Sequence, residues 1–119
     1  MKGFPLLTID NAPEKSKPAL RTLEGAFGMI PNVAATMATS PVLIGSLVGL
    51  FQWVHGGSFT ELQIQTLLLT NAVTNGSAWA IAFHSGLALK EGLDDADVQA
   101  IRAKRDPRDA KLAALSIFA

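Results

Sequence analysis

The sequence of 119 residues contains no cysteine. This absence excludes disulfide bonds, thiolate nucleophiles, thiolate metal ligands and thiol-based redox sensing within the chain. A chain without disulfides suits a reducing compartment, so we expect the protein in the cytoplasm. Histidine is scarce too, with two residues and no carboxylate cluster beside either, so we predict no metal site and no bound cofactor.

The chain also lacks an excess of charge of either sign and a long apolar run. Ten Lys and Arg residues balance ten Asp and Glu residues, which gives no bulk field to attract nucleic acid or an anionic membrane. The basic residues of the last thirty positions alternate with aspartates, a pattern typical of a solvated surface. No stretch of about 20 apolar residues is uninterrupted, so we expect a soluble protein without a signal peptide or membrane span.

Charge is nearly absent from the middle of the chain. Between Glu24 and Lys90 the only formally charged side chain is Glu61. A surface helix normally carries a charged face, so helices this neutral should be buried nearly all round. A monomer of this size cannot bury that much of itself, and we therefore expect a homo-oligomer.

Apolar periodicity, glycines and prolines predict an all-α fold, organised as a single domain over residues 1–119. The predicted helices span 18–28, 32–38, 41–55, 59–75, 77–91, 95–104 and 107–119. Asn32, Ser40, Ser58, Asp94 and Asp106 are the expected N-caps, Ser58 forming a capping box with Glu61. We expect a compact bundle around the antiparallel pair 60–75 and 77–91. The apolar stripe of the last helix continues to Ala119, which predicts a longer ancestor or a partner that covers its end.

Four positions within the central pair carry a recognisable spacing. Ser77 lies twelve residues after Gln65, Ala80 three residues after Ser77, and His84 four residues after Ala80. This spacing resembles the motif of the alkylhydroperoxidase D and carboxymuconolactone decarboxylase family, in which a glutamate precedes Cys-x-x-Cys and a histidine. The upstream segment GAFGMIPNVAATMATSPVLIGSL is similar to the Phe-Gly-x-x-Pro-Asn segment of the peroxidase-related branch, and HSGLALKEGLDDADVQAI is similar to the run after the motif. The resemblance covers Phe27 to Ile101.

The resemblance implies a fold and an oligomer, a trimer or hexamer, but not the family's redox activity. In the family the second cysteine attacks a hydroperoxide, the glutamate and histidine move protons, and a dithiol partner restores the reduced pair. Here Gln65 cannot take up a proton at neutral pH, and Ser77 and Ala80 cannot form a disulfide. Only His84 matches the family residue.

The residues at these positions also restrict other chemistry. Ser77 and His84 lie seven residues apart, roughly 10 Å along a helix axis, so the histidine cannot deprotonate the serine directly. We interpret Ser77 as a helix cap. His84 could act as an acid or base on a small carbonyl substrate, or it could be a core histidine hydrogen-bonded to Gln65 or to a backbone carbonyl. Trp79 and Phe83 could line a pocket, or pack in the core or an interface.

Three functional hypotheses therefore remain open. In the first hypothesis, the chain is a redox-silent member of the family, and its parent would reduce hydroperoxides with thiols. Alternatively, it is a cysteine-independent lyase like the decarboxylase branch, with His84 as its acid–base group. The third hypothesis is a non-catalytic oligomer, structural or binding a small apolar ligand beside Trp79 and Phe83.

Overall fold

The computed structural model describes residues 3–119, and this part of the chain is helical without strands. The all-α prediction is thereby confirmed. The chain divides into two compact units, Met1–Gly57 and Ser58–Ala119, each with its own cluster of buried apolar residues. No helix among the described residues is both long enough and apolar enough to cross a membrane.

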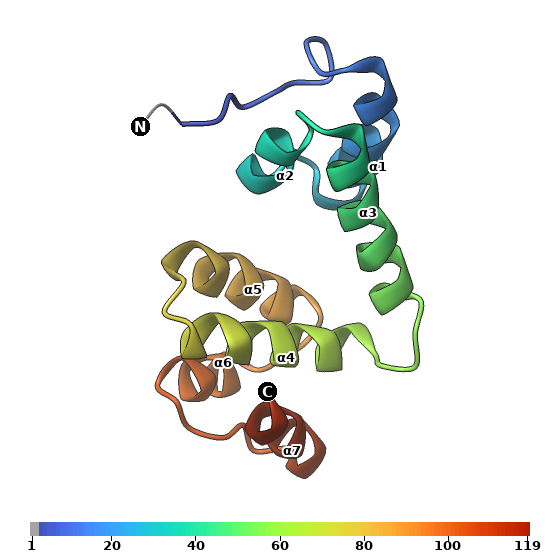
Figure 1. The fold of residues 1–119 in the computed structure, drawn as a ribbon. Coiled ribbons are helices and arrows are strands. Elements are labelled where there is room, and N and C mark those ends of the chain that lie inside the picture. The colour runs from blue at the N-terminus through green and yellow to red at the C-terminus, as the bar shows by residue number, and fades with distance from the viewer. Residues whose placement is uncertain (1–2) are drawn as a thin grey trace. The chain divides into compact units, whose positions relative to one another are not determined.

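The described part of the first unit, residues 3–57, contains four helical elements. These are the 3₁₀ turn η1 (Glu14–Ser16) and the helices α1 (Lys17–Phe27), α2 (Asn32–Met37) and α3 (Pro41–His55), coloured blue to green in Figure 1. Leu20 of α1 and Ile44 of α3 are fully buried at the centre of this unit. The buried hydroxyl of Ser16 donates a 2.7 Å hydrogen bond to the carbonyl of Ala38, which joins η1 to the end of α2.

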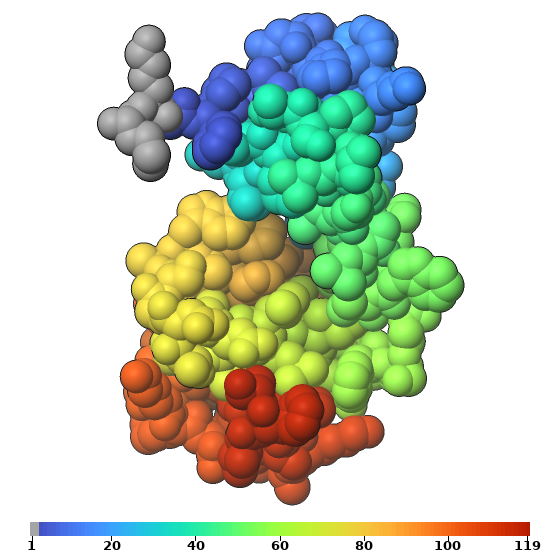
Figure 2. All heavy atoms as spheres, viewed as in Figure 1, coloured from blue at the N-terminus to red at the C-terminus, as the bar shows by residue number. Residues whose placement is uncertain are grey.

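The second unit contains α4 (Glu61–Thr74), α5 (Ala78–Lys90), α6 (Asp95–Arg102) and α7 (Ala110–Phe118). Helix α4 packs against each of the other three, and α5 runs beside it in the opposite direction, as the sequence predicts (Figure 1). Figure 2 shows the side chains of α7, in red, lying directly on those of α4. Leu69 of α4 and Ile101 of α6 form the centre of the buried cluster that these helices share.

Three turns in this unit have the same geometry. After α4, α5 and α6 the chain enters the left-handed region at Gly76 (φ 65°), Gly92 (φ 98°) and Lys104 (φ 57°). In each turn the amide of the left-handed residue and the amide of the residue after it donate hydrogen bonds to carbonyls of the preceding helix. This is the hydrogen-bond pattern of a Schellman motif. Glycine adopts this backbone without strain, whereas a side chain at the same position crowds the following carbonyl. Lys104 is the only residue other than glycine with a positive φ between residues 3 and 119.

The start of α4 differs from the predicted one. Thr60, and not Ser58, is the N-cap: its hydroxyl accepts a hydrogen bond from the Gln63 amide at 3.2 Å, and the Gln63 side chain accepts one from the Thr60 amide at 3.0 Å. Glu61 is therefore the first helical residue and not the partner in the box. The Ser58 and Thr60 registers both offer a hydroxyl cap, and the register that forms satisfies two backbone donors with one pair of side chains.

The start of α7 was also predicted too early. Asp109, and not Asp106, caps the helix by accepting hydrogen bonds from the amides of Lys111 and Leu112. The physical reason lies eleven residues upstream, where Asp97 of α6 accepts the backbone N–H of Arg108 at 3.0 Å. This contact and the side-chain bonds of Arg108 to Asp94 and Asp97 hold the loop before α7 against α6, and the helix begins where Asp109 satisfies two of its first amides.

Two other expected caps are not formed by their side chains. Asn32 is the first residue of α2, where Pro31 occupies the N-cap position. Asp94 occupies the N-cap of α6 but makes no side-chain capping bond, because its carboxylate binds the Arg108 guanidinium at 2.6 Å instead. The Ser40 cap of α3 is confirmed, with its hydroxyl accepting from the Leu43 amide.

Candidate functional site

Two of the four motif positions are in direct contact. Gln65 lies on the second turn of α4 and is 3% exposed, and His84 lies half-buried on the second turn of α5. Nδ1 of His84 is 2.9 Å from Oε1 of Gln65. The sequence alone is compatible with a bond from His84 to Gln65 or to a backbone carbonyl, and the structure has the bond to Gln65.

The turn between the helices brings these residues together. Gly76 adopts its left-handed conformation directly after α4, and the amide of Ser77 bonds back to the carbonyl of Ala72 at 3.0 Å. The chain reverses direction within three residues, so that α5 returns along α4. Gln65 lies ten residues before Asn75 and His84 lies eight residues after Gly76, which places them at similar heights on the antiparallel pair.

The contact determines which ring nitrogen of His84 carries hydrogen. An amide oxygen only accepts hydrogen bonds, so Nδ1 of His84 must be the donor. In the neutral ring the lone pair is then on Nε2, which is the nitrogen able to accept a proton. Gln65 thus orients the imidazole and selects its tautomer without carrying a charge of its own.

The electrostatic setting of the pair is nearly neutral. Apart from Glu61 at the start of α4 and Lys90 at the end of α5, neither helix carries an ionisable side chain other than His84. The phenyl ring of Phe83 meets the His84 imidazole edge to face, with ring centroids 5.2 Å apart. The acid–base capacity of these two helices near the motif therefore resides in one imidazole.

Ser77 and Ala80 lie on the same helix as His84 but do not form a catalytic group with it. Ser77 is the exposed N-cap residue of α5, and Ala80 is half-buried one turn later. The serine is in the predicted position, yet its hydroxyl makes no capping hydrogen bond, which corrects the expectation that its side chain caps the helix. The amide of Ser77 is already held by Ala72, and this backbone contact defines the start of α5 without the hydroxyl.

Trp79 and Phe83 form an aromatic pair on α5. Their rings stack with centroids 4.8 Å apart and an interplanar angle of 15°, as expected for aromatic residues one helical turn apart. The Trp79 side chain is 51% exposed within the described structure. The pair provides a flat apolar surface one residue away from Ala80 and from His84.

Ser85, directly after His84 in the sequence, is a buried polar residue of α5. Ser85 lies on the stripe of α5 that also contains Ile81 and Ala88, both of which belong to the apolar cluster of the second unit. Its Oγ is buried and has no hydrogen-bond partner among residues 3–119. The helical spacing 81, 85, 88 was the signal that could have identified it.

Three groups of the second unit with clearly shifted pKa values form a separate cluster. The Arg108 side chain donates to Asp97 and to Asp94, and these hydrogen bonds hold the pKa of both carboxyls below their ordinary range and raise the pKa of Arg108. Asp97 also accepts the backbone amide of Arg108. This cluster connects α6 to the start of α7, and its role is structural.

Other candidate residues lie outside the motif. His55 is at the end of α3, with its ring 4.1 Å from that of Phe51 between centroids. No group of three or more His, Asp or Glu side chains within the described part of the chain is arranged to hold a metal ion.

A comparison with models of known protein families found no match to this sequence, and a comparison with curated proteins found no relative.

Proposed function

We propose that this chain is a redox-silent protein of the alkylhydroperoxidase D and carboxymuconolactone decarboxylase type, from the peroxidase-related branch. The observation that carries the proposal is the 2.9 Å contact between His84 and Gln65. Two residues nineteen positions apart, assigned by the resemblance to one proton-handling pair, touch each other. Ser77 and Ala80 precede His84 on the same helix at the spacing that the thiol couple would require.

The replaced residues account for the silence. Hydroperoxide reduction needs a thiolate to attack the O–O bond and a second thiol to condense with the resulting sulfenic acid, releasing water and forming a disulfide. A hydroxyl at Ser77 and a methyl group at Ala80 supply neither group. Gln65 preserves the hydrogen bond to the imidazole but cannot exchange a proton at neutral pH.

The proposal includes a homo-oligomer, and the apolar surface supports it. On α3 the side chains of Val42, Leu50 and Trp53 are exposed, the tryptophan at 83%. At the other end of the chain Ile117 and Phe118 are exposed on α7. Exposed apolar side chains on helices with little or no charge are typical of surfaces that associate with another copy or another protein. Sedimentation velocity should give a mass that is a multiple of the monomer's 12.6 kDa.

The thiol chemistry can be tested by restoring it. The triple variant Gln65→Glu, Ser77→Cys, Ala80→Cys is expected to form a reducible disulfide and to consume an organic hydroperoxide in the presence of a dithiol. The unmodified chain should consume none. A matched control is Ala110→Cys, Ala113→Cys, which places two thiols three residues apart at the start of α7, away from any glutamate or histidine of the motif.

The control separates position from the mere presence of thiols. If the triple variant keeps its helical circular dichroism but reduces hydroperoxide no faster than the control pair, the assignment of the motif is wrong. Hydroperoxide turnover by the unmodified chain would contradict the proposed silence itself.

One observation favours a second candidate function. The Nδ1–H tautomer selected by Gln65 leaves Nε2 of His84 as the basic nitrogen, the form required of a general base. This suits a cysteine-independent lyase like the decarboxylase branch, which acts on a small lactone acid. The test is carbon dioxide release from carboxymuconolactone by the unmodified chain and by His84→Ala. Loss of activity in the variant would support this candidate, whereas no release by either protein would leave the non-catalytic oligomer as the competing proposal.

A further inference from the structure

A cavity in the second unit lies apart from Gln65 and His84. It has a volume of about 240 Å³ and is bounded by the outer face of α4, the end of α6, the loop before α7 and α7 itself. Its lining is mixed, with two apolar side chains, three hydroxyls, two cations and one carboxylate: Val73, Ile101, Thr70, Thr74, Ser116, Lys104, Arg105 and Asp106. The volume is smaller than that of most ligand pockets, which restricts an occupant to the size of a simple metabolite.

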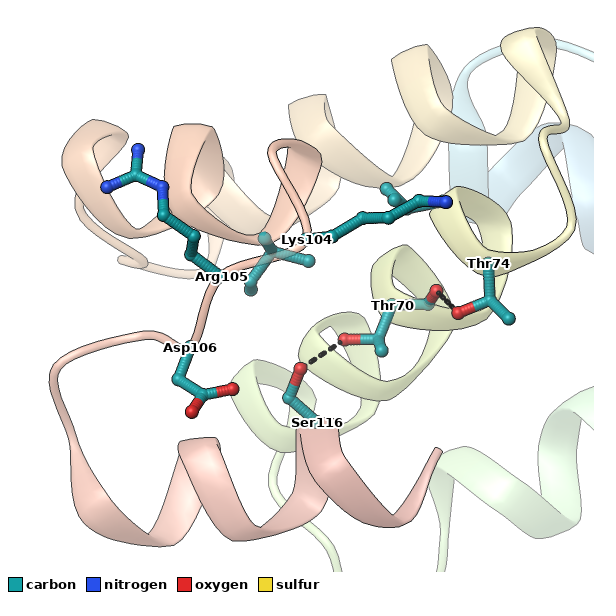
Figure 3. Close-up of a pocket in the computed structure, with 8 residues that line it drawn as sticks. Thr70, Thr74, Lys104, Arg105, Asp106 and Ser116 are labelled. Carbon is teal, nitrogen blue, oxygen red and sulfur yellow. Dashed lines mark hydrogen bonds between the residues drawn. The ribbon is translucent and has the colours of Figure 1, made fainter.

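Opposite charges are placed at separate ends of this cavity. Figure 3 shows the Lys104 side chain extending toward Thr74, the Asp106 carboxylate on the side of Ser116, and the Arg105 guanidinium pointing away from the hydroxyls. Among residues 3–119, Lys104 and Asp106 form no ion pair with each other or with any other group, since Arg108 takes Asp94 and Asp97. The cavity therefore presents a positive group and a negative group at different positions, both available to a ligand.

The hydroxyls strengthen the acceptor character at the Asp106 end. Thr70 donates its proton to the carbonyl of Thr66 at 2.8 Å, so the 2.9 Å contact between Thr70 and Ser116 requires Ser116 to be the donor. The lone pairs of Ser116 then remain for an incoming donor. At the opposite end, Thr74 donates its proton to the carbonyl of Thr70, so its lone pairs face the side of the cavity where Lys104 lies.

Backbone strain coincides with the cationic end. Lys104 occupies the left-handed position of a turn for which the two other turns of the same type in this unit use Gly76 and Gly92. A side chain here costs stability, and such strain concentrates at ligand sites. The residue that bears it is the one that projects an ammonium group over the cavity.

We propose that this cavity binds a small zwitterion, an amino carboxylate with a short apolar side chain. The ligand carboxylate binds Lys104, its ammonium group binds Asp106 and Ser116, and its aliphatic part contacts Val73 and Ile101. A simple anion would meet the Asp106 carboxylate unfavourably, and a simple cation would meet Lys104. The zwitterion alone satisfies both ends.

The test is an NMR titration of the full ¹⁵N-labelled chain with L-valine. Two further probes remove one charge each: isovalerate lacks the ammonium group and isobutylamine lacks the carboxylate. Valine should produce saturable shifts at the amides of Thr74, Lys104 and Ser116, and each single-charge probe should bind at least about tenfold more weakly.

Variants locate the two ends of the ligand. Lys104→Gln and Asp106→Asn should each weaken valine binding by at least about tenfold, while the matched controls Lys111→Gln and Asp95→Asn should change it by less than about twofold. The absence of saturable shifts with valine, or equal binding of isovalerate, overturns the proposal. So does undiminished binding by a Lys104→Gln variant that keeps the wild-type spectrum elsewhere.

Discussion

The Nδ1 atom of His84 donates to Oε1 of Gln65 across the α4–α5 pair, linking residues nineteen positions apart by a bond of 2.9 Å. One partner is an amide buried to 3% exposure, and the other is the only ionisable group in the central part of either helix. Because the amide cannot titrate, the bond positions the imidazole and leaves its chemistry to Nε2. Variants of Gln65 and His84 can therefore distinguish the proposed loss of redox activity from the alternative acid–base role.

Replacing the Gln65 amide should allow both neutral tautomers of the His84 imidazole to form. In Gln65→Leu the Nδ1–H donor loses its acceptor, and we expect a mixture of tautomers in the ¹⁵N NMR spectrum of His84 and a loss of about 1 kcal/mol in the free energy of unfolding. The control Gln99→Leu removes an amide that is exposed on α6 and should leave the His84 signals unchanged. An unaltered His84 spectrum in Gln65→Leu would show that the contact does not select the tautomer.

The capping box at the start of α4 makes a second prediction. Thr60→Ala should lower the free energy of unfolding by about 1 kcal/mol, because the amide of Gln63 loses its acceptor. Ser58→Ala should leave the unfolding free energy nearly unchanged, since Ser58 lies outside the helix and does not cap it. Urea denaturation of both variants decides between the two registers: a larger loss in Ser58→Ala would restore the cap expected from the sequence.

Stability at low pH should depend on Asp97. Hydrogen bonds from the Arg108 side chain and amide hold the pKa of Asp97 below its ordinary value of 3.8 in the folded protein. A carboxyl with a lower pKa in the folded state contributes stability that is complete above the unfolded-state pKa and is lost as the pH falls through the folded-state pKa.

We therefore expect the melting temperature to fall as the pH drops below about 4, and Asp97→Asn to flatten this part of the profile. At neutral pH the variant should melt below the wild type, because its neutral amide accepts more weakly from Arg108. Asp95→Asn, on the same first turn of α6 but without a contact to Arg108, is the control. Parallel profiles for Asp97→Asn and wild type between pH 5 and the acid limit would contradict the assignment.

Relief of strain at Lys104 gives a prediction with the opposite sign. Lys104→Gly should raise the free energy of unfolding by about 1 kcal/mol, because glycine adopts the left-handed backbone without the penalty of a side chain. Gly92→Ala, at the equivalent position after α5, should lower it by a similar amount. Thermal unfolding of the two variants checks both signs, and a destabilised Lys104→Gly protein would mean that the lysine side chain contributes more than its backbone costs.

Much of the helical layout could be predicted because the signals are local. Gly28, the Ser40–Pro41 pair, Gly76 and Gly92 mark helix ends through their own backbone preferences, and the structure confirms each of them. Where two local signals competed, as at Ser58 and Thr60, the pattern could not say which hydroxyl would find a reciprocal partner. The 3₁₀ turn Glu14–Ser16 was missed because three residues offer no periodicity to detect.

The sequence by itself determined that no thiol chemistry is possible in this chain and that its central helices carry almost no charge, since both are matters of which atoms are present. It also determined where most helices begin and end, because capping and φ preferences act within a few residues. Only the tertiary structure decided that His84 bonds to Gln65, that Arg108 turns toward Asp97 and delays α7, and that Lys104 takes a backbone suited to glycine. Each of these depends on groups brought together by the packing of separate helices, a long-range free energy that no short window of sequence contains.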